Sequence, residues 1–135
     1  MKYLIDTHTL LWAITDAEQL PENVFDILSK PDENEILVST VSFWEIAIKT
    51  SIGKLTLDNF DIYKLIEYCD SLGFSILTLE PEDSLFYAKI PVNPSHKDPF
   101  DRMLIATAIN NSFTLISKDE NIPLYASDGL LFLWK

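Results

Sequence analysis

Residues 1–14, MKYLIDTHTLLWAI, contain the first predicted strand and the first predicted helix of this chain. Within this stretch, Tyr3–Ile5 is a short apolar run without alternating polar positions, which predicts a buried strand that ends at Asp6. Apolar residues within 7–14 have helical spacing, so a helix is expected to follow at once. The chain therefore opens with a strand that runs directly into a helix, as the repeating units of α/β folds do.

The same alternation continues along the chain. Apolar runs predict further strands at 35–40, 74–79 and 114–117, and 130–134 is a candidate fifth strand. Helical spacing, with proline or glycine near several of the ends, predicts helices at about 21–29, 42–52, 61–72, 81–90 and 100–110. We therefore expect one α/β domain over residues 1–135, with three α/β/α layers and a central, mostly parallel sheet of four or five strands.

The composition limits the classes of protein that remain. With 135 residues, 47% of them hydrophobic, the chain can bury a continuous core without a disulfide or a structural metal. Its single cysteine, Cys69, is expected to be a small core residue. The start does not resemble a signal peptide, and no apolar run is long enough to span a bilayer, so a cytoplasmic protein is expected.

The charge balance is strongly acidic, with a formal net charge of −11 from 21 acidic and 10 basic residues. This argues against loose, nonspecific binding of nucleic acid, because phosphate contacts come from lysine and arginine. Two arrangements would still allow a nucleic-acid substrate. Acidic residues grouped around divalent metal ions reverse the local charge, and an acidic surface suits a basic protein partner.

Four acidic residues fall near the ends of predicted strands. Asp6 ends the first strand, Glu45 lies in the first turn of the helix after the second, and Asp119 follows the fourth. These three are expected at one edge of the sheet, because sites in open α/β folds form outside the carboxyl ends of the strands. Asp101 joins them if its helix begins at that edge. Such carboxylates repel one another unless cations lie among them, and Mg²⁺ or Mn²⁺ suits oxygen ligands. The pattern favours metal-assisted hydrolysis of a phosphate ester.

Each acid also has a local alternative. Glu45 has the capping-box spacing from Ser42, which predicts that the helix begins there, and it lies four residues before Lys49, a spacing that allows an ion pair. The other local roles are an N-cap for Asp6, an N-cap before Pro99 for Asp98, the first helical turn for Asp101, and a turn for Asp119.

Four segments carry these acids: LIDTHTLLW at 4–12, STVSFWEIAIK at 39–49, HKDPFDRMLIATA at 96–108 and LISKD at 115–119. Their content and order resemble the motifs of PIN-domain ribonucleases, in particular VapC-type toxins of type II toxin–antitoxin systems. The stretch HKDPFDR is the most specific of them. The four segments span nearly the whole chain, and no acid of the family pattern is missing.

The resemblance implies a PIN fold and Mg²⁺- or Mn²⁺-dependent cleavage of RNA. It implies that Asp6, Glu45, Asp101 and Asp119 form the catalytic pocket, with Asp6, Asp101 and Asp119 as the metal ligands. Glu45 would bind the metal through water or orient the attacking water. Asp98 is an additional acid, which we expect to cap the helix or to support a ligand.

The basic residues near these motifs have two interpretations. Arg102 either contacts substrate phosphate or pairs with Asp98 at helical spacing. His96 either contacts phosphate or acts as an acid, although we expect an exposed loop histidine without such a role. Local pairing is favoured for Lys49 and Lys97, and Lys118 is a further candidate for phosphate contact.

Partners follow from the resemblance as well. PIN toxins dimerise and are inhibited by a small antitoxin whose tail crosses the acidic groove, so a homodimer, an antitoxin and an RNA substrate are expected. The aromatic stripe around Phe43 and Trp44 and the segment Leu130–Trp134 are expected in the core or the dimer surface, not in an RNA-stacking platform. The alternative is a non-catalytic PIN-like module that only binds a partner; such a module would lack carboxylate-dependent Mn²⁺ binding.

Overall fold

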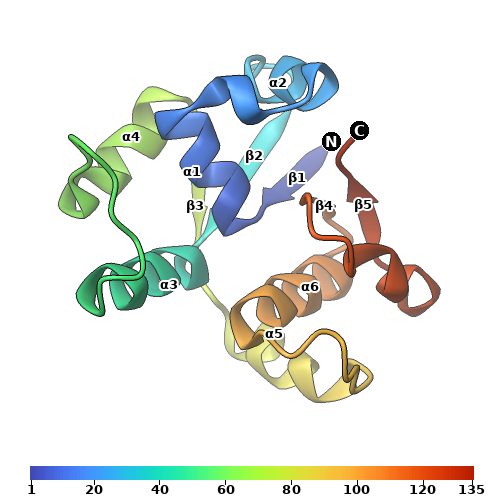
Figure 1. Cartoon of the computed structure of the whole chain (residues 1–135). Coiled ribbons are helices and arrows are strands. Elements are labelled where there is room, and N and C mark those ends of the chain that lie inside the picture. The colour runs from blue at the N-terminus through green and yellow to red at the C-terminus, as the bar shows by residue number, and fades with distance from the viewer.

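The computed structural model describes residues 1–135 and has a central sheet of five parallel strands (Figure 1). The strands lie in the order β3-β2-β1-β4-β5. Their bounds are β1 Lys2–Ile5, β2 Glu35–Ser39, β3 Ser75–Leu77, β4 Thr114–Ile116 and β5 Leu131–Leu133. The predicted α/β class, the parallel sheet and the candidate fifth strand are thus confirmed, although β3 is shorter than the predicted 74–79.

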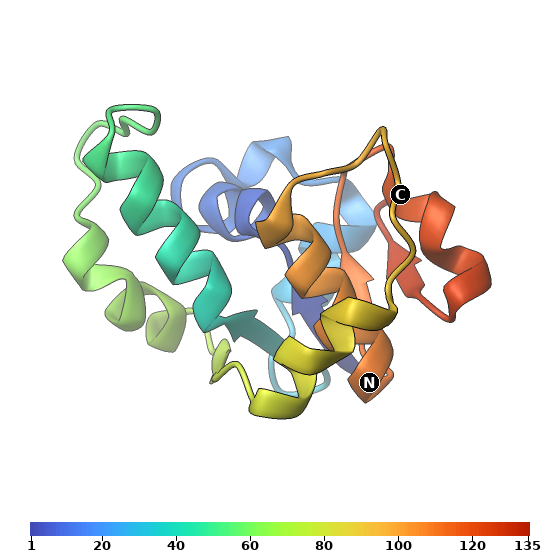
Figure 2. The ribbon, with the colours of Figure 1, turned by 90° about the horizontal axis from the view of Figure 1, so that it is seen from below.

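Helices cover both faces of this sheet. The α-helices are α1 Thr7–Thr15, α2 Glu22–Leu28, α3 Thr40–Ser51, α4 Leu65–Ser71, α5 Pro81–Phe86 and α6 Pro99–Asn111. Short 3-10 helices are η1 Ala17–Gln19, η2 Ile62–Lys64, η3 Tyr87–Lys89 and η4 Ile122–Asp128. Figures 1 and 2 show α1 and α2 on one side of the sheet and α5 and α6 on the other. No helix is both long and apolar enough to cross a membrane.

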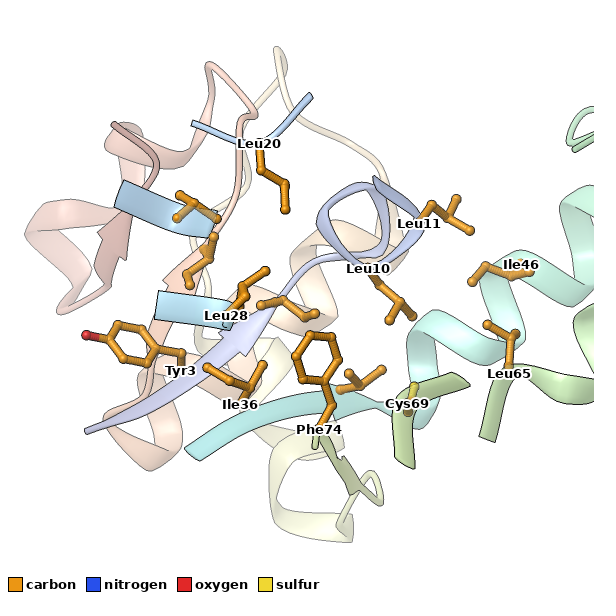
Figure 3. Close-up of a cluster of buried hydrophobic side chains, with 14 residues drawn as sticks. Tyr3, Leu10, Leu11, Leu20, Leu28, Ile36, Ile46, Leu65, Cys69 and Phe74 are labelled. Carbon is orange, nitrogen blue, oxygen red and sulfur yellow. The ribbon is translucent and has the colours of Figure 1, made fainter. Parts of the chain in front are cut away.

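The two faces of β1 explain the layers. Tyr3 and Ile5 point into one core, which is shared with α1, α2 and α4 and contains the buried Cys69 (Figure 3). Leu4 points into the opposite core, which is packed mainly by α6 and includes Leu104. A strand buried on both faces needs apolar residues at successive positions, and β1 has them.

The strand order reverses beside β1. The chain adds β2 and β3 on one side of β1 and then returns to place β4 and β5 on the other side. At the carboxyl ends, Ile5 is in register with Ile116, and the Asp6 backbone N–H donates to the Ile116 carbonyl at 3.1 Å. This is the switch point of the sheet, where open α/β folds form their crevice.

Two local predictions need correction. Helix α3 begins at Thr40, and Ser39 is its N-cap, with Oγ accepting from the Val41 N–H at 3.0 Å. Ser42 therefore lies buried within the helix and is not the predicted cap, because the helix follows β2 without a connecting loop. The single helix predicted at 61–72 is instead the short η2 followed by α4.

Candidate metal-dependent active site

Asp6 lies at the switch point and combines capping with a position in the site. Its Oδ1 accepts from the Thr9 N–H at 2.9 Å and the Thr9 hydroxyl at 2.6 Å, which caps α1. Its Oδ2 accepts from the Ser117 hydroxyl at 2.6 Å, at the end of β4. Burial raises the pKa of the Asp6 carboxyl above its ordinary value, although these hydrogen bonds act in the opposite direction. The carboxylate is therefore held rigidly from two elements.

Asp101 reaches the same place from the start of α6. Asp98 caps this helix, its Oδ1 accepting from the Phe100 N–H at 2.9 Å, and Pro99 follows as the first helical residue. The Asp101 carboxylate accepts no hydrogen bond from a protein donor. Burial raises its pKa to about 8, and the neighbouring negative charges act in the same direction; these are Asp98, Asp6, Glu45 and Asp119. The acids that were predicted to cluster thus lie close enough to raise the pKa of Asp101.

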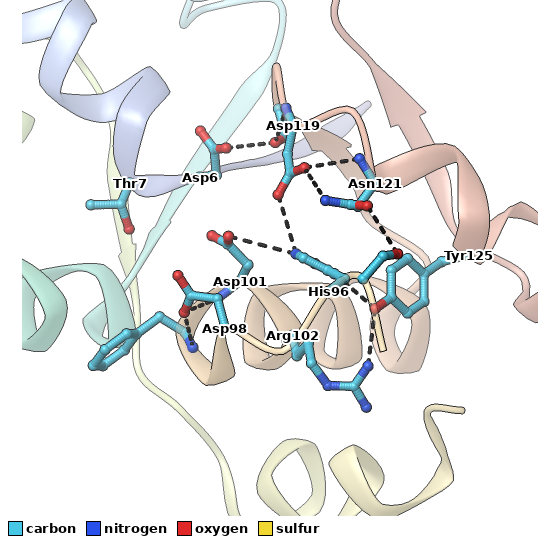
Figure 4. Close-up of polar contacts among 12 residues, drawn as sticks. Asp6, Thr7, His96, Asp98, Asp101, Arg102, Asp119, Asn121 and Tyr125 are labelled. Atoms are coloured by element: carbon cyan, nitrogen blue, oxygen red, sulfur yellow. Dashed lines mark hydrogen bonds and ion pairs between the residues drawn. The ribbon is translucent and has the colours of Figure 1, made fainter. Parts of the chain in front are cut away.

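Asp119 follows β4 and faces His96. Its Oδ1 accepts from the Asn121 N–H at 2.9 Å and from the Asn121 side-chain amide at 3.1 Å. Its Oδ2 is 3.1 Å from His96 Nε2, and Asp101 Oδ2 is 3.7 Å from the same nitrogen (Figure 4). The expectation that His96 is an exposed loop residue is wrong, because its side chain is only 4% exposed.

Glu45 lies beside this group and is bound by its own partners. Its Oε1 accepts from the Thr7 hydroxyl at 2.6 Å, and its Oε2 pairs with Lys49 on the next turn of α3. The predicted pairing of Glu45 with Lys49 is thus confirmed. The Thr7 hydroxyl also lies 3.0 Å from the Ser42 hydroxyl, so this network joins the starts of α1 and α3.

Arg102 lies away from the acids, in a buried network. Its guanidinium donates to the Tyr87 hydroxyl at 3.2 Å, to the Tyr125 hydroxyl at 2.9 Å and to the Pro91 carbonyl at 3.0 Å. The alternative pairing of Arg102 with Asp98 is wrong, since no ion pair joins them. Because the side chain is buried and its donors are engaged, this arrangement also disfavours a contact with substrate phosphate.

The carboxylates line a hollow at the surface. Its volume is about 330 Å³, and its lining residues are Asp6, His8, Trp12, Asp101, Lys118, Asp119 and Glu120. Glu45 lines a neighbouring hollow of about 290 Å³ instead. The structure thus brings three of the four predicted acids to one cavity and places the fourth next to it.

The side chains present fit a hard divalent cation. A carboxylate oxygen of Asp101 and one of Asp119 lie within 4.8 Å of each other and of a ring nitrogen of His96. Asp101 has no hydrogen-bond donor, and a cation beside it would relieve the charge repulsion that raises its pKa. Carboxylate oxygens are the ligands that Mg²⁺ and Mn²⁺ use in proteins.

The sequence comparisons identify the family. Residues 3–127 match the PIN domain family, and the chain belongs to that family. No curated protein matches the chain at the sequence level.

Solved structures share the fold at low sequence identity. One chain of VapBC2 from Rickettsia felis, bound to a DNA fragment from its promoter, is 16% identical with a TM-score of 0.66, over 100% of both chains. One chain of the DNA-bound VapBC from Salmonella typhimurium is 13% identical with a TM-score of 0.65, over 98% of this chain and 97% of that one. One chain of FitAcB from Neisseria gonorrhoeae is 20% identical with a TM-score of 0.61, over 97% of this chain and 96% of that one.

Proposed function

We propose that this protein is a metal-dependent endoribonuclease and the toxin of a toxin–antitoxin pair. Asp6, Asp101 and Asp119 are the proposed ligands of Mg²⁺ or Mn²⁺, and Glu45 is the fourth catalytic acid. The observation that carries the proposal is the group of three carboxylates around one hollow at the sheet switch point, where the pKa of Asp101 is raised to about 8.

The chemistry follows from how these residues are held. Divalent ions bound at such a site supply an activated water and stabilise the leaving oxygen of a phosphodiester. Thr9 and Ser117 fix both oxygens of Asp6, so its orientation does not depend on the substrate. Asn121 fixes Oδ1 of Asp119, and Oδ2 lies 3.1 Å from His96 Nε2. Preorganised ligands lower the cost of assembling the reacting groups.

The position of Lys118 supports the proposal of a phosphate-containing substrate. Of the basic candidates, Lys49 is paired with Glu45 and Arg102 is buried. Lys97 is exposed and lacks the local ion pair expected for it, but it does not line the hollow, whereas the exposed Lys118 does. Its Nζ lies 5.5 Å from the centroid of the Trp12 ring, which holds the cation beside the carboxylates. A cation in this place can contact the phosphate of an RNA strand whose scissile bond lies at the acids.

An antitoxin is the proposed protein partner, and the cytoplasm is the proposed compartment. The structural neighbours named above are VapBC and FitAcB chains, and two of those structures include DNA. The acidic hollow of this chain is complementary to an arginine or lysine of such a partner. An inserted basic side chain would occupy the place proposed for the metal ions and the RNA strand.

A homodimer is the proposed assembly. An apolar groove of about 500 Å³ lies between α3, α5 and α6 and is lined mainly by hydrophobic residues, among them Trp44, Leu85 and Phe100. Trp44 is 62% exposed and Leu85 is 76% exposed, which leaves a large apolar area facing solvent. Light scattering of the purified protein tests this assignment, and a Trp44→Ser variant is expected to shift a dimer toward the monomer.

The experiment for the proposed function is RNA cleavage by the purified, antitoxin-free protein. Total cellular RNA is incubated with Mg²⁺ or Mn²⁺, with EDTA, with Asp6→Asn, and with Asp70→Asn as a control at an exposed acid on α4. Discrete fragments with the wild type and Asp70→Asn, but not with EDTA or Asp6→Asn, support a metal-dependent ribonuclease. Asp6→Asn that folds and cuts at the wild-type rate would refute the site.

The alternative is a non-catalytic PIN-like module that binds a partner. Mn²⁺ binding distinguishes the two, because a module that does not hydrolyse RNA is expected to lack Mn²⁺ binding that depends on the carboxylates. A folded wild-type protein without Mn²⁺ binding at the acids, and without RNA cleavage, would favour this alternative.

A further inference from the structure

Three buried side chains form a hydrogen-bonded chain that ends at the acidic site. Arg102 Nη1 donates to the Tyr125 hydroxyl at 2.9 Å, and this hydroxyl lies 2.8 Å from His96 Nδ1 (Figure 4). All three residues are buried, with 6%, 1% and 4% exposed for Arg102, Tyr125 and His96. These hydrogen bonds therefore connect the interior beneath α6 with the acidic site. The roles proposed for the catalytic acids do not explain why this buried network is present.

The protons in this chain can be assigned. A guanidinium only donates hydrogen bonds, so Arg102 uses a lone pair of the Tyr125 oxygen. The Tyr125 hydroxyl proton then needs an acceptor, and His96 Nδ1 is the only other polar atom in contact with that oxygen. Nδ1 is therefore the acceptor. A neutral imidazole carries one proton, so in this ring it lies on Nε2.

His96 Nε2 lies close to two of the proposed metal ligands. It lies 3.1 Å from Asp119 Oδ2 and 3.7 Å from Asp101 Oδ2, on the side of the ring away from Tyr125. It is buried and makes no well-aligned hydrogen bond with either carboxylate. The nitrogen thus faces the space between two carboxylates from different elements, α6 and the turn after β4.

We propose that Arg102 and Tyr125 hold the proton of His96 on Nε2, so that this N–H positions the carboxylates of Asp119 and Asp101. His96 is then a positioning residue for the metal ligands and is not a ligand itself. The opposite arrangement, with Nε2 bound to the metal, requires a proton on Nδ1 and leaves the buried Tyr125 hydroxyl proton without an acceptor. The inference rests on the proposed metal site for its functional meaning, but the tautomer is independent of any activity.

The tautomer can be measured directly. The chain has only two histidines, so the imidazole ¹⁵N signals of His96 in ¹⁵N-histidine-labelled protein are assigned with a His8→Gln variant. The proposal predicts a protonated Nε2 and an unprotonated Nδ1 in the metal-free and Mg²⁺-loaded protein. A proton on Nδ1 in either state would overturn it. So would a directly bound histidine nitrogen in pulsed EPR of the Mn²⁺-loaded protein.

Two matched hydroxyl deletions test the functional part. Tyr125→Phe removes the group that bonds His96 but keeps the ring that packs edge-on against the imidazole, and Tyr87→Phe removes a different hydroxyl that bonds only Arg102. Tyr125→Phe is expected to lose the single His96 tautomer and to weaken Mn²⁺ binding about 10-fold, as is typical when a group that orients metal ligands is removed. Tyr87→Phe is expected to change neither.

The outcomes separate this inference from the proposed function. Equal Mn²⁺ affinity in folded Tyr125→Phe and wild type, or an unchanged His96 tautomer in that variant, would overturn the positioning role. A wild type with the predicted tautomer and Mn²⁺ affinity but without RNA cleavage would sustain the inference and contradict the ribonuclease.

Discussion

Replacing Asp101 by Asn is expected to stabilise the metal-free protein while it removes metal binding. Asn has nearly the shape of Asp and leaves the backbone N–H that meets Asp98 in place. It removes a negative charge from a group of five acids, whose mutual repulsion helps to raise the pKa of Asp101 to about 8. A residue that is retained for metal binding at the expense of the fold is expected to show this opposition between stability and function.

The sign and size follow from the pKa. The folded protein holds the Asp101 proton more tightly than the unfolded chain, so this contribution to stability is complete below pH 3.8 and is lost as the pH rises through about 8. Each pH unit in that interval changes the free energy of unfolding by at most about 1.4 kcal/mol. The whole interval, from pH 3.8 to about 8, therefore sets an upper limit of about 6 kcal/mol. Near pH 8 we expect Asp101→Asn to be about 2–3 kcal/mol more stable than the wild type. The value lies below the limit because the Asp101 side chain is 26% exposed and solvent screens part of the repulsion.

The assay is urea unfolding of the wild type, Asp101→Asn and the exposed-site control Asp70→Asn, in EDTA, between about pH 4 and about pH 8, the interval between the two pKa values. The stability of Asp101→Asn relative to wild type should rise across this range, and Asp70→Asn should follow the wild type. Mn²⁺ should raise the stability of the wild type and leave Asp101→Asn unchanged. A constant difference between the two proteins at every pH would refute the electrostatic account of this site.

Two further predictions concern the fold. Gly53 and Gly73 both have positive φ, at +74° and +77°, but a Cβ at Gly73 would lie 2.8 Å from Pro31, whereas one at Gly53 would meet nothing within 4 Å. Urea unfolding should show that Gly53→Ala loses about 1 kcal/mol and Gly73→Ala at least about 1 kcal/mol more, and equal losses would contradict the packing against Pro31. Cys69 is fully buried, and burial raises the pKa of its thiol to about 11, so Ellman's reagent should react with it only after unfolding. Labelling of the native protein at the denatured rate would contradict its place in the core.

The central strands β1, β2 and β4 could be predicted from local patterns because they are buried on both faces. Continuous apolar runs such as Tyr3–Ile5 suit strands that are covered on both faces, and their alternation with helical segments predicts a parallel sheet between two layers of helices. The ends of the helices were harder to predict from the sequence. Ser39 and Ser42 both have N-cap chemistry, and only the direct passage from β2 into α3 decides between them.

The acids of the site could also be predicted, because connectivity alone places the carboxyl ends of parallel strands at one edge. The partners of those acids could not. Ser117 lies 111 positions after Asp6, and Tyr125 lies 29 positions after His96, so no local pattern indicates either contact. The burial of His96 depends on the packing of η4 against its loop, and a histidine between proline-rich segments looks exposed until that packing is known.

The assignment of the acidic hollow as the active site is tested most directly by a Mn²⁺ titration, in which bound Mn²⁺, measured by EPR, and RNA cleavage are followed on the same samples. The wild type should bind Mn²⁺ and cleave RNA in proportion to its occupancy, and Asp101→Asn should do neither while remaining folded. Cleavage that continues in folded Asp101→Asn, or in wild type without bound metal, would contradict the assignment of the acidic hollow as the active site.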